Sequence, residues 1–442
     1  MKLFFRIIDG LLIAVTSCLY GIVCLQKSFL FTVPLFLLLF VAINVFPSIS
    51  NFKYKNTRLR ICAEGVDLLC AFIIGSFISI AVHIFIAFIV LPEFLLQYIL
   101  SCVCVLSVLS VTFWNGIIRV YVTSVQLGIK HRVIGALCGF IPIANLFALA
   151  KIITVCGREV DFENGKILLN ESRKNQAVCK TKYPLLLVHG VFFRDFKYLN
   201  YWGRIPNELK KNGAEIYFGN HQSALSVADS AAELTERIKQ IVEETGCHKV
   251  NVIAHSKGGL DCRYAVSRCG ADKYIASLTT INTPHRGCLF ADYLLDKVPD
   301  SVINTIAKSY NSSLKKLGDS NPDFLSAVYD LTNERCEALN KTITNSPSVY
   351  YQSTGSKLNK ATSGKFPLNF TYHIAKHFDG ANDGLVSEKS FKWGDNYIFL
   401  TTEGSRSISH GDMVDLNREN IKDFDVREFY VQLVNDLKSK GF

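Results

Sequence analysis

Two patterns of hydrophobic and polar residues divide the chain. Residues 1 to about 155 are dense in Leu, Ile, Val and Phe, and four apolar runs there have about the length that crosses a bilayer as a helix. The runs are Gly10–Leu25, Phe29–Phe46, Val66–Leu91 and Tyr98–Ile118. Four such runs in succession would leave little polar surface to face water, so residues 1–155 are predicted to be an all-helical transmembrane region.

A fifth apolar segment, Val133–Val155, has two interpretations, because Pro142 and Asn145 fall in its middle. As a fifth span it would carry the rest of the chain to the other side of the membrane. As a re-entrant or interfacial hairpin it would leave the rest on the side where the fourth span ends.

Positive charge is concentrated in the apolar part. Up to residue 160 the chain has 12 Lys or Arg and 5 Asp or Glu, a balance of +7, and the whole chain has 48 and 38, which leaves +3 for the remainder. This excess favours contact with acidic lipid headgroups over nucleic acid. The positive-inside rule places the loop between the second and third runs in the cytoplasm, and its basic residues are Lys53, Lys55, Arg58 and Arg60. We therefore expect a protein of the cell membrane, and the hairpin interpretation of Val133–Val155, which we adopt, places its soluble part in the cytoplasm.

From residue 183 onward, short apolar runs alternate with amphipathic stretches. Ser230-Ala-Ala-Glu233 predicts the capped start of a helix that Gly246 ends. Strands that alternate with helices predict a mostly parallel sheet covered on both faces. The predicted strands are Tyr183–Val188, Glu215–Phe218, Val250–Ala254, Leu278–Ile281, Val349–Gln352 and Tyr397–Leu400. We interpret residues 183–442 as one α/β domain and the polar residues 156–182 as a linker.

One predicted strand leads directly into His255-Ser256-Lys257-Gly258-Gly259, and a helix is predicted from Leu260. A serine hydroxyl is a poor nucleophile unless it is held clear of the sheet beside a base. A sharp strand–turn–helix does this and requires small residues two before and two after the serine. Ala254 and Gly258 occupy these positions, so Ser256 is the candidate nucleophile.

In this kind of site the chain order is serine, acid, histidine. Asp383 lies in a tight Asn-Asp-Gly loop, and His410 is the only histidine after it. We expect His410 to act as the general base and Asp383 to hold its tautomer, with Asp379 as the competing acid. The backbone N–H groups of Lys257 and Val191 are expected to form the oxyanion hole.

These motifs together resemble the bacterial triacylglycerol lipases over roughly residues 183–416. The resemblance implies an α/β-hydrolase fold and maps Ser256, Asp383 and His410 onto the triad, and Val191 and Lys257 onto the oxyanion hole. The apolar first third resembles nothing in the secreted members. The motifs that carry the resemblance are Tyr183–Gly190, Lys249–Gly259, Thr283–Gly287 and Asn382–Ser387.

The resemblance also raises the question of calcium. Many of these lipases hold a structural Ca²⁺ through an Asp two residues after the catalytic histidine, and Asp412 matches that position. The family's second Asp has no counterpart, because no Asp lies between Asp330 and Asp379, and the next expected ligand falls at about Leu416. One hard-oxygen ligand is too few for calcium. We therefore expect no cofactor and keep Asp412 as the single calcium candidate.

Residues from about 288 to 345 form an insertion that is too long for a simple connection. Val302, Ile306, Tyr310, Leu314 and Leu317 line one face of a predicted helix. The pattern is typical of an amphipathic lid that opens on lipid. A fixed cap helix over the sheet is the alternative.

Taken together, the sequence predicts a membrane-anchored lipase or carboxylesterase that cleaves acyl esters of membrane lipids through an acyl-enzyme on Ser256. Two alternatives stay open: an acyltransferase that uses the same three residues, and a catalytically silent membrane scaffold.

Overall fold

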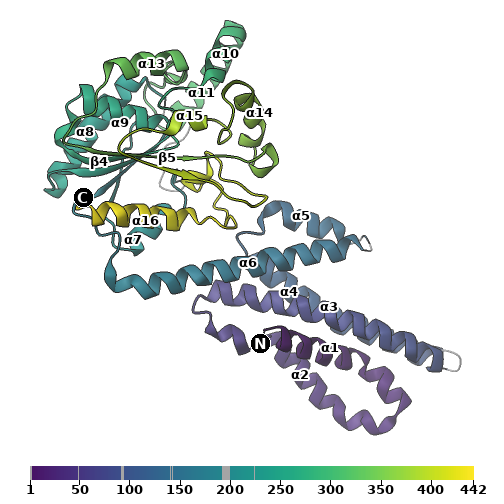
Figure 1. Ribbon diagram of the computed structural model, residues 1–442. Coiled ribbons are helices and arrows are strands. Elements are labelled where there is room, and N and C mark those ends of the chain that lie inside the picture. Colours follow the sequence, from purple (N-terminus) through teal and green to yellow (C-terminus); the bar gives the residue numbers. More distant parts are fainter. Residues whose placement is uncertain are drawn as a thin grey trace. The chain divides into compact units, whose positions relative to one another are not determined.

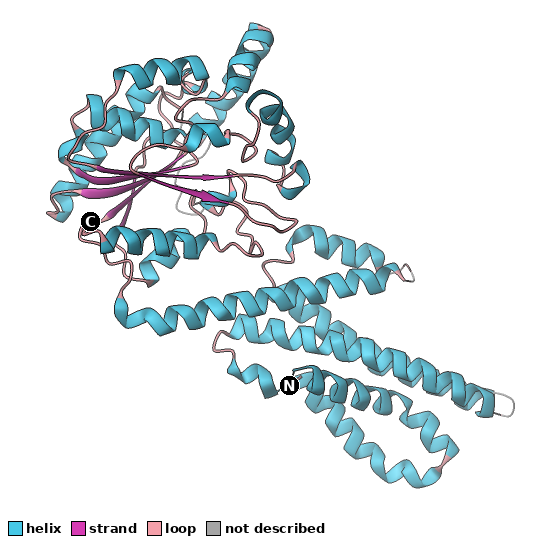
Figure 2. Cartoon of the chain, in the orientation of Figure 1, coloured by secondary structure: helices cyan, strands magenta, loops and turns pink. Residues whose placement is uncertain are grey.

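The chain forms two compact units, Met1–Leu169 and Asn170–Phe442. In this computed structural model, residues 2–47, 49–90, 94–139, 141, 143–191, 200–222 and 224–442 are described. The first unit consists of helices, and the second contains a sheet with helices on both faces (Figures 1 and 2).

Four stretches of the first unit are long and apolar enough to cross a membrane: Lys2–Leu25, Lys27–Val45, Thr57–Ile89 and Leu95–Thr123. They coincide with the four predicted runs, so the first unit has helices of the length and apolarity that a membrane-spanning region requires. The helices of the unit are α1 (Lys2–Leu25), η1 (Lys27–Thr32), α2 (Val33–Val45), η2 (Ile49–Lys53), α3 (Thr57–Val90), α4 (Leu95–Thr123), α5 (Gly128–Cys138) and α6 (Ala144–Arg173).

Glycines bring the long helices together. A β-carbon on Gly65 of α3 would lie 2.9 Å from the carbonyl oxygen of Gly116 on α4. A β-carbon on Gly75 of α3 would lie 3.3 Å from the carbonyl oxygen of Gly10 on α1. Small residues allow such close backbone approach where helices associate in lipid, because no hydrophobic force drives apolar helices together there.

The segment Val133–Val155 is not one continuous helix. Helix α5 ends at Cys138 and α6 begins at Ala144, with Ile143 at a φ of 68° between them. Pro142 lies outside the described residues. At 1.5 Å per residue, the 11 residues of α5 extend only about 16 Å, roughly half of the hydrocarbon core. The helical part of Val133–Val155 is therefore divided between two helices.

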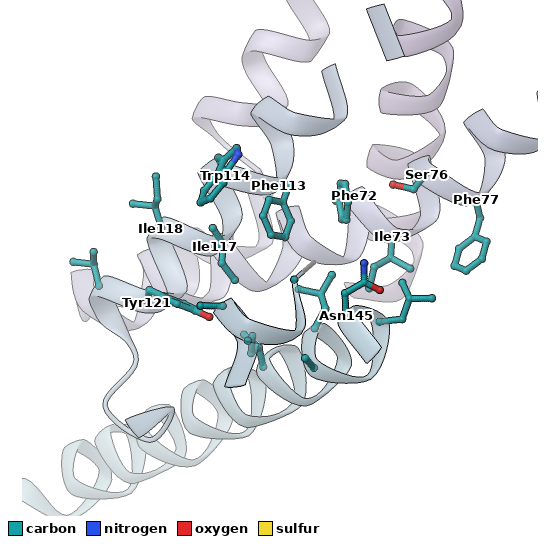
Figure 3. Close-up of a pocket in the computed structure, with 18 of the residues that line it drawn as sticks. Phe72, Ile73, Ser76, Phe77, Phe113, Trp114, Ile117, Ile118, Tyr121 and Asn145 are labelled. Carbon is teal, nitrogen blue, oxygen red and sulfur yellow. The ribbon is translucent and has the colours of Figure 1, made fainter. Parts of the chain in front are cut away.

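Helices α3 to α6 enclose an apolar cavity of about 620 Å³. Figure 3 shows Phe72 of α3 beside Phe113 of α4, with their ring centroids 5.2 Å apart, and Asn145 of α6 among the few polar groups of the lining. None of the residues predicted for catalysis lines this cavity.

The second unit is built on a six-stranded parallel sheet with the strand order β2-β1-β3-β4-β5-β6. All six predicted strands are present, with boundaries that differ by a few residues. They are β1 (Leu185–Val188), β2 (Ile216–Phe218), β3 (Val250–His255), β4 (Ile275–Ile281), β5 (Tyr350–Ser356) and β6 (Asn396–Leu400). This order and the helical connections are those of the predicted α/β-hydrolase fold.

Alternate residues of the strands build two cores. Leu185 and Leu187 of β1 pack with α7 and α16, whereas Leu186 and Val188 pack with α8 and α9. Figure 1 shows these helix pairs on opposite faces of the sheet. The helices and 3-10 turns are η3 (Lys174–Gln176), α7 (Ile205–Lys211), α8 (Val227–Thr245), α9 (Lys257–Arg268), η4 (Ala271–Lys273), α10 (Leu289–Lys297), α11 (Asp300–Lys316), α12 (Phe324–Tyr329), α13 (Asn333–Thr342), η5 (Ala361–Ser363), α14 (Leu368–Asp379), α15 (Glu388–Phe391), η6 (Asp412–Val414) and α16 (Val426–Ser439).

The polar stretch 156–182, predicted to link the two parts, contains the boundary between the two units and is helical as far as Arg173, because it is rich in good helix formers and contains no proline. The predicted start of the helix at Ser230 was wrong. Helix α8 begins one turn earlier than predicted, since the Ser226 side chain accepts the Asp229 N–H and caps it. Ser230 lies inside the helix, and Gly246 ends it in the left-handed conformation.

Candidate active site

Ser256 occupies the sharp turn between β3 and α9. Its backbone has φ 56° and ψ −131°, a strained conformation for a residue with a side chain. A β-carbon on Gly190 would lie 2.8 Å from Cβ of Ser256, and one on Gly258 would collide with the carbonyl oxygen of His189. Only glycine fits at these two positions. Ala254 is fully buried in the core under α8 and α9, where its methyl group is accommodated.

Gly258→Ala should therefore distort the turn. Overpacking against a backbone atom costs roughly 1–3 kcal/mol, and we expect at least a roughly tenfold loss of turnover as the serine moves. Ester hydrolysis and the thermal midpoint would be measured together. Gly157→Ala is the matched control, because a β-carbon there meets nothing within 4 Å. Equal turnover in the two variants would contradict this account of the turn.

Asp383 and His410 are brought together at the same edge of the sheet. The His410 Nδ1–H donates to Asp383 Oδ2 over 2.7 Å, and the His410 backbone N–H donates to the Asp383 carbonyl over 2.9 Å. The other carboxylate oxygen accepts the N–H groups of Leu385 and Val386, at 2.9 and 2.7 Å. The carboxylate is thus held acceptor-only and fixes the histidine tautomer that leaves Nε2 free to accept a proton.

The competing acid, Asp379, belongs to a different contact. It ends α14, and its carboxylate accepts the backbone N–H groups of Leu289 and Phe290 at the start of α10. Burial raises the pKa of Asp379 in spite of these bonds. The described contacts connect it to α10 and not to His410.

The expected oxyanion donors flank Ser256. Lys257 is the first residue of α9, so its N–H belongs to the unsatisfied amides at a helix N-terminus. Val191 follows the end of β1 and is buried, next to Gly190, whose Cα approaches Ser256. Both residues thus lie at the carboxyl edge of the sheet, where ligands bind in open α/β folds.

Triacylglycerol lipase 2 of Saccharomyces cerevisiae is 30% identical to this chain over 275 residues, which cover 56% of this chain and 78% of the yeast protein. The chain belongs to the triacylglycerol lipase family. These proteins are carboxylic ester hydrolases. The triacylglycerol lipase of Pseudarthrobacter phenanthrenivorans is 34% identical over 40% of this chain, and this chain spans 57% of its length.

Two further similarities accompany the lipase relationship. The palmitoyl protein thioesterase family matches residues 184–341, which include the turn at Ser256. A crystal structure of a Bacillus licheniformis lipase in its mature form is 21% identical, with a TM-score of 0.43, and covers 57% of this chain and 92% of that one.

The calcium candidate of this lipase-family chain does not fit a metal site. One oxygen of Asp412 accepts from the Arg406 guanidinium over 2.6 Å, and the other accepts the Ser409 N–H over 2.8 Å. A cationic side chain thus occupies the carboxylate that a calcium ion would need. Among the described residues, no cluster of three His, Cys, Asp or Glu side chains could hold a metal.

A directed chain of hydrogen bonds lies behind the three candidate catalytic residues. Burial lowers the pKa of His255 well below its ordinary value, so the ring is neutral. Its Nε2–H donates to the His410 carbonyl over 3.2 Å, and its Nδ1 accepts the Tyr201 hydroxyl over 2.6 Å. The Tyr201 oxygen in turn accepts the Gly190 N–H over 3.2 Å. Tyr201 and His255 therefore join the end of β1 to the backbone of the expected base.

Tyr201→Phe tests how much this chain of hydrogen bonds contributes to turnover. Without the hydroxyl, His255 Nδ1 and the Gly190 N–H lose their partner, and we expect kcat to fall roughly tenfold, about 1.4 kcal/mol, with KM little changed. Steady-state kinetics on a soluble ester would measure both constants. Tyr217→Phe is the control, because the Tyr217 hydroxyl donates to exposed Glu215. A rise in KM at constant kcat would refute a positioning role.

Neither Tyr201 nor the second partner of Asp383 was anticipated from the sequence. Asn282 Nδ2 donates to Asp383 Oδ2 over 2.7 Å, from the position directly after β4. A polar residue at the carboxyl end of a predicted strand is a signal that could have identified Asn282. Tyr201 lies two residues after a stretch, 192–199, that is outside the described part of the chain, and no spacing rule points to it.

The predicted lid region contains four helices, α10 to α13. Leu314 near the end of α11 is buried in a cluster with Val191, Ala224 and Ala327, so this end of the helix covers the expected oxyanion donor. Val302, Ile306 and Tyr310 on the same helix are 40–46% exposed. One half of α11 is therefore anchored, and the other half presents apolar side chains to the surroundings.

Proposed function

We propose that the chain is a membrane-anchored serine hydrolase that cleaves carboxylic acyl esters of lipids through an acyl-enzyme. The observation that carries the proposal is the 2.7 Å contact between His410 and Asp383 beside the strained Ser256. The His410 ring lies 4.5 Å from that of His255, the residue that precedes the serine.

In this mechanism, His410 Nε2 takes the proton of the Ser256 hydroxyl while Oγ attacks the acyl carbon. The carbonyl oxygen becomes an oxyanion that the N–H groups of Lys257 and Val191 stabilise. When the tetrahedral intermediate collapses, the alcohol leaves with the proton from His410. A water molecule, deprotonated by the same nitrogen, then attacks the acyl-enzyme and releases the carboxylic acid.

A fluorophosphonate probe tests this proposal directly, because it phosphonylates activated serines. The reconstituted full-length protein should be labelled, and Ser256→Ala should not be. Absence of labelling in the parent protein, or labelling that survives in the variant, would refute the assignment.

The match to palmitoyl protein thioesterases favours one second candidate, the hydrolysis of long-chain thioesters by the same acyl-enzyme route. The acyl part and the oxyanion are common to both reactions, so only the leaving group differs. Comparing kcat/KM for an oxygen ester and a thioester of equal chain length separates the candidates.

We further propose that the four apolar helices anchor the chain in the cell membrane and that the hydrolase unit lies in the cytoplasm. The basic loop before α3 supports a cytoplasmic position for that loop. Four spans then return the chain to the same side, since α5 and the start of α6 form a non-spanning hairpin. Ser301→Cys tests this placement. We expect an impermeant thiol reagent to add no label to intact cells beyond the parent background, and added label would reverse the orientation.

A further inference from the structure

Helix α14 covers the loops that carry the expected acid and base. The Thr371 hydroxyl donates to the carbonyl of Gly384, next to Asp383. A β-carbon on Gly411, next to His410, would lie 3.5 Å from Leu368 Cδ1. The inner face of α14 is thus in contact with the catalytic loops.

The outer face of α14 is aromatic. Phe366, just before the helix, is 83% exposed, and Phe370 is 68% exposed. His373 and His377 are exposed too and continue the same face at a spacing of three and four residues. Leu416, which packs on Gly411, adds a 45% exposed side chain beside the loop of His410. Exposed phenylalanines at such density are uncommon on a surface that only meets water.

Positive charge is concentrated in the segment of the chain that carries the two phenylalanines. Residues 338–378 contain five lysines and no aspartate or glutamate: Lys341, Lys357, Lys360, Lys365 and Lys376. Lys365 pairs with Glu419 over 2.8 Å, whereas Lys360 and Lys376 are exposed in the same segment as the two phenylalanines. Aromatic side chains with flanking lysines are the composition that binds the boundary between anionic headgroups and hydrocarbon.

We propose that Phe366, Phe370 and Leu416, with Lys360 and Lys376, form a docking face that rests on the surface of an anionic bilayer. Contact there brings the catalytic loops to the lipid boundary, so an ester can enter the site without crossing water. This inference rests on the proposed function, because that function supplies the lipid ester as the substrate. The membrane-associated helices of the same chain raise the effective concentration of the bilayer, so even weak contacts suffice.

Bromolipid quenching tests the contact in the full-length protein, reconstituted in vesicles of phosphatidylcholine and phosphatidylglycerol. The parent has three tryptophans, so its fluorescence is subtracted from that of the variant. The additional fluorescence from Phe370→Trp should be quenched strongly. Tyr274→Trp is the matched control, because Tyr274 precedes β4 at the opposite edge of the sheet and should be quenched several-fold less. Quenching of Ile306→Trp on α11 without quenching of Phe370→Trp would overturn the proposal, as would equal quenching at Phe370 and Tyr274.

Kinetics separate docking from chemistry. Phe366→Ser/Phe370→Ser should lower hydrolysis of a bilayer-resident ester roughly tenfold and leave hydrolysis of water-soluble p-nitrophenyl acetate within twofold. Equal rates on the bilayer ester would refute the docking face. A parent protein inactive on the soluble ester would instead refute the proposed function, and the quenching experiment would still decide the docking face.

Discussion

Asp383→Asn is expected to lower kcat roughly 10⁴-fold while the fold is kept. The carboxylate accepts four hydrogen bonds, from the N–H groups of Leu385 and Val386, from Asn282 and from His410. An amide has one acceptor oxygen. If that oxygen faces the two backbone amides, its NH₂ group meets His410 Nδ1, which must then accept, and Nε2 carries the proton. In that tautomer the ring cannot take a proton from Ser256. Rapid-quench or steady-state rates on a soluble ester would measure the loss.

Asp379→Asn is the matched control, because it changes the only other candidate acid in the same way. Its carboxylate contacts the start of α10, so we expect kcat within a few-fold of the parent. A large loss of kcat with Asp379→Asn and a small loss with Asp383→Asn would assign the role of the triad acid to Asp379 instead. Comparable thermal midpoints for both variants would show that the rates reflect chemistry and not unfolding.

The framework of the candidate site can be proposed from the sequence alone, because local rules govern it. The turn at Ser256 needs an apolar strand, small neighbours and a following helix, and all three are visible within about fifteen residues. The order of Asp383 and His410 along the chain then limits the remaining choice. The parallel sheet brings these loops to one edge, so chain order translates into proximity.

What the sequence could not predict depends on contacts between distant segments. Tyr201 meets His255 across 54 residues, and Asn282 meets Asp383 across 101. Periodicity carries no information on such pairs. The segment Val133–Val155 was ambiguous for a related reason, since mean apolarity does not distinguish one helix from two short ones joined by a turn.

Lys257 shows how far a residue's environment can differ from its sequence pattern. It directly follows the proposed nucleophile, where only its backbone N–H had an expected role. Its side chain is 1% exposed, and the ammonium donates to Asp261 over 2.6 Å and to Ser230 over 3.0 Å. An ion pair thus lies buried below the first turn of α9, the turn that holds the expected oxyanion donor.

At about pH 8, where the carboxyl is ionised, Asp261→Ala should consequently destabilise the hydrolase unit by about 3–5 kcal/mol, since it leaves a buried ammonium without its counter-ion. For a domain of this size such a change lowers the thermal midpoint by roughly 6–20 °C. Loss of soluble-ester hydrolysis during a temperature ramp would report the midpoint. Asp229→Ala is a suitable control, because Asp229 is an exposed acid on α8. A midpoint unchanged in Asp261→Ala would mean that the lysine finds water or another partner.

The double variant Lys257→Met/Asp261→Leu should recover most of that loss, because it removes both charges together. Burial raises the pKa of Asp261 to about 7, although the Lys257 ammonium opposes the rise. A carboxyl group whose folded pKa is raised contributes stability below its unfolded pKa and loses it as the pH rises through the folded value. The parent should therefore lose stability relative to the double variant between about pH 4 and pH 8. Thermal midpoints of the parent and the double variant, measured across that range, would check the direction of this change. If the parent instead gained stability relative to the double variant as the pH rises, the attraction between Lys257 and Asp261 would outweigh the desolvation of the carboxylate.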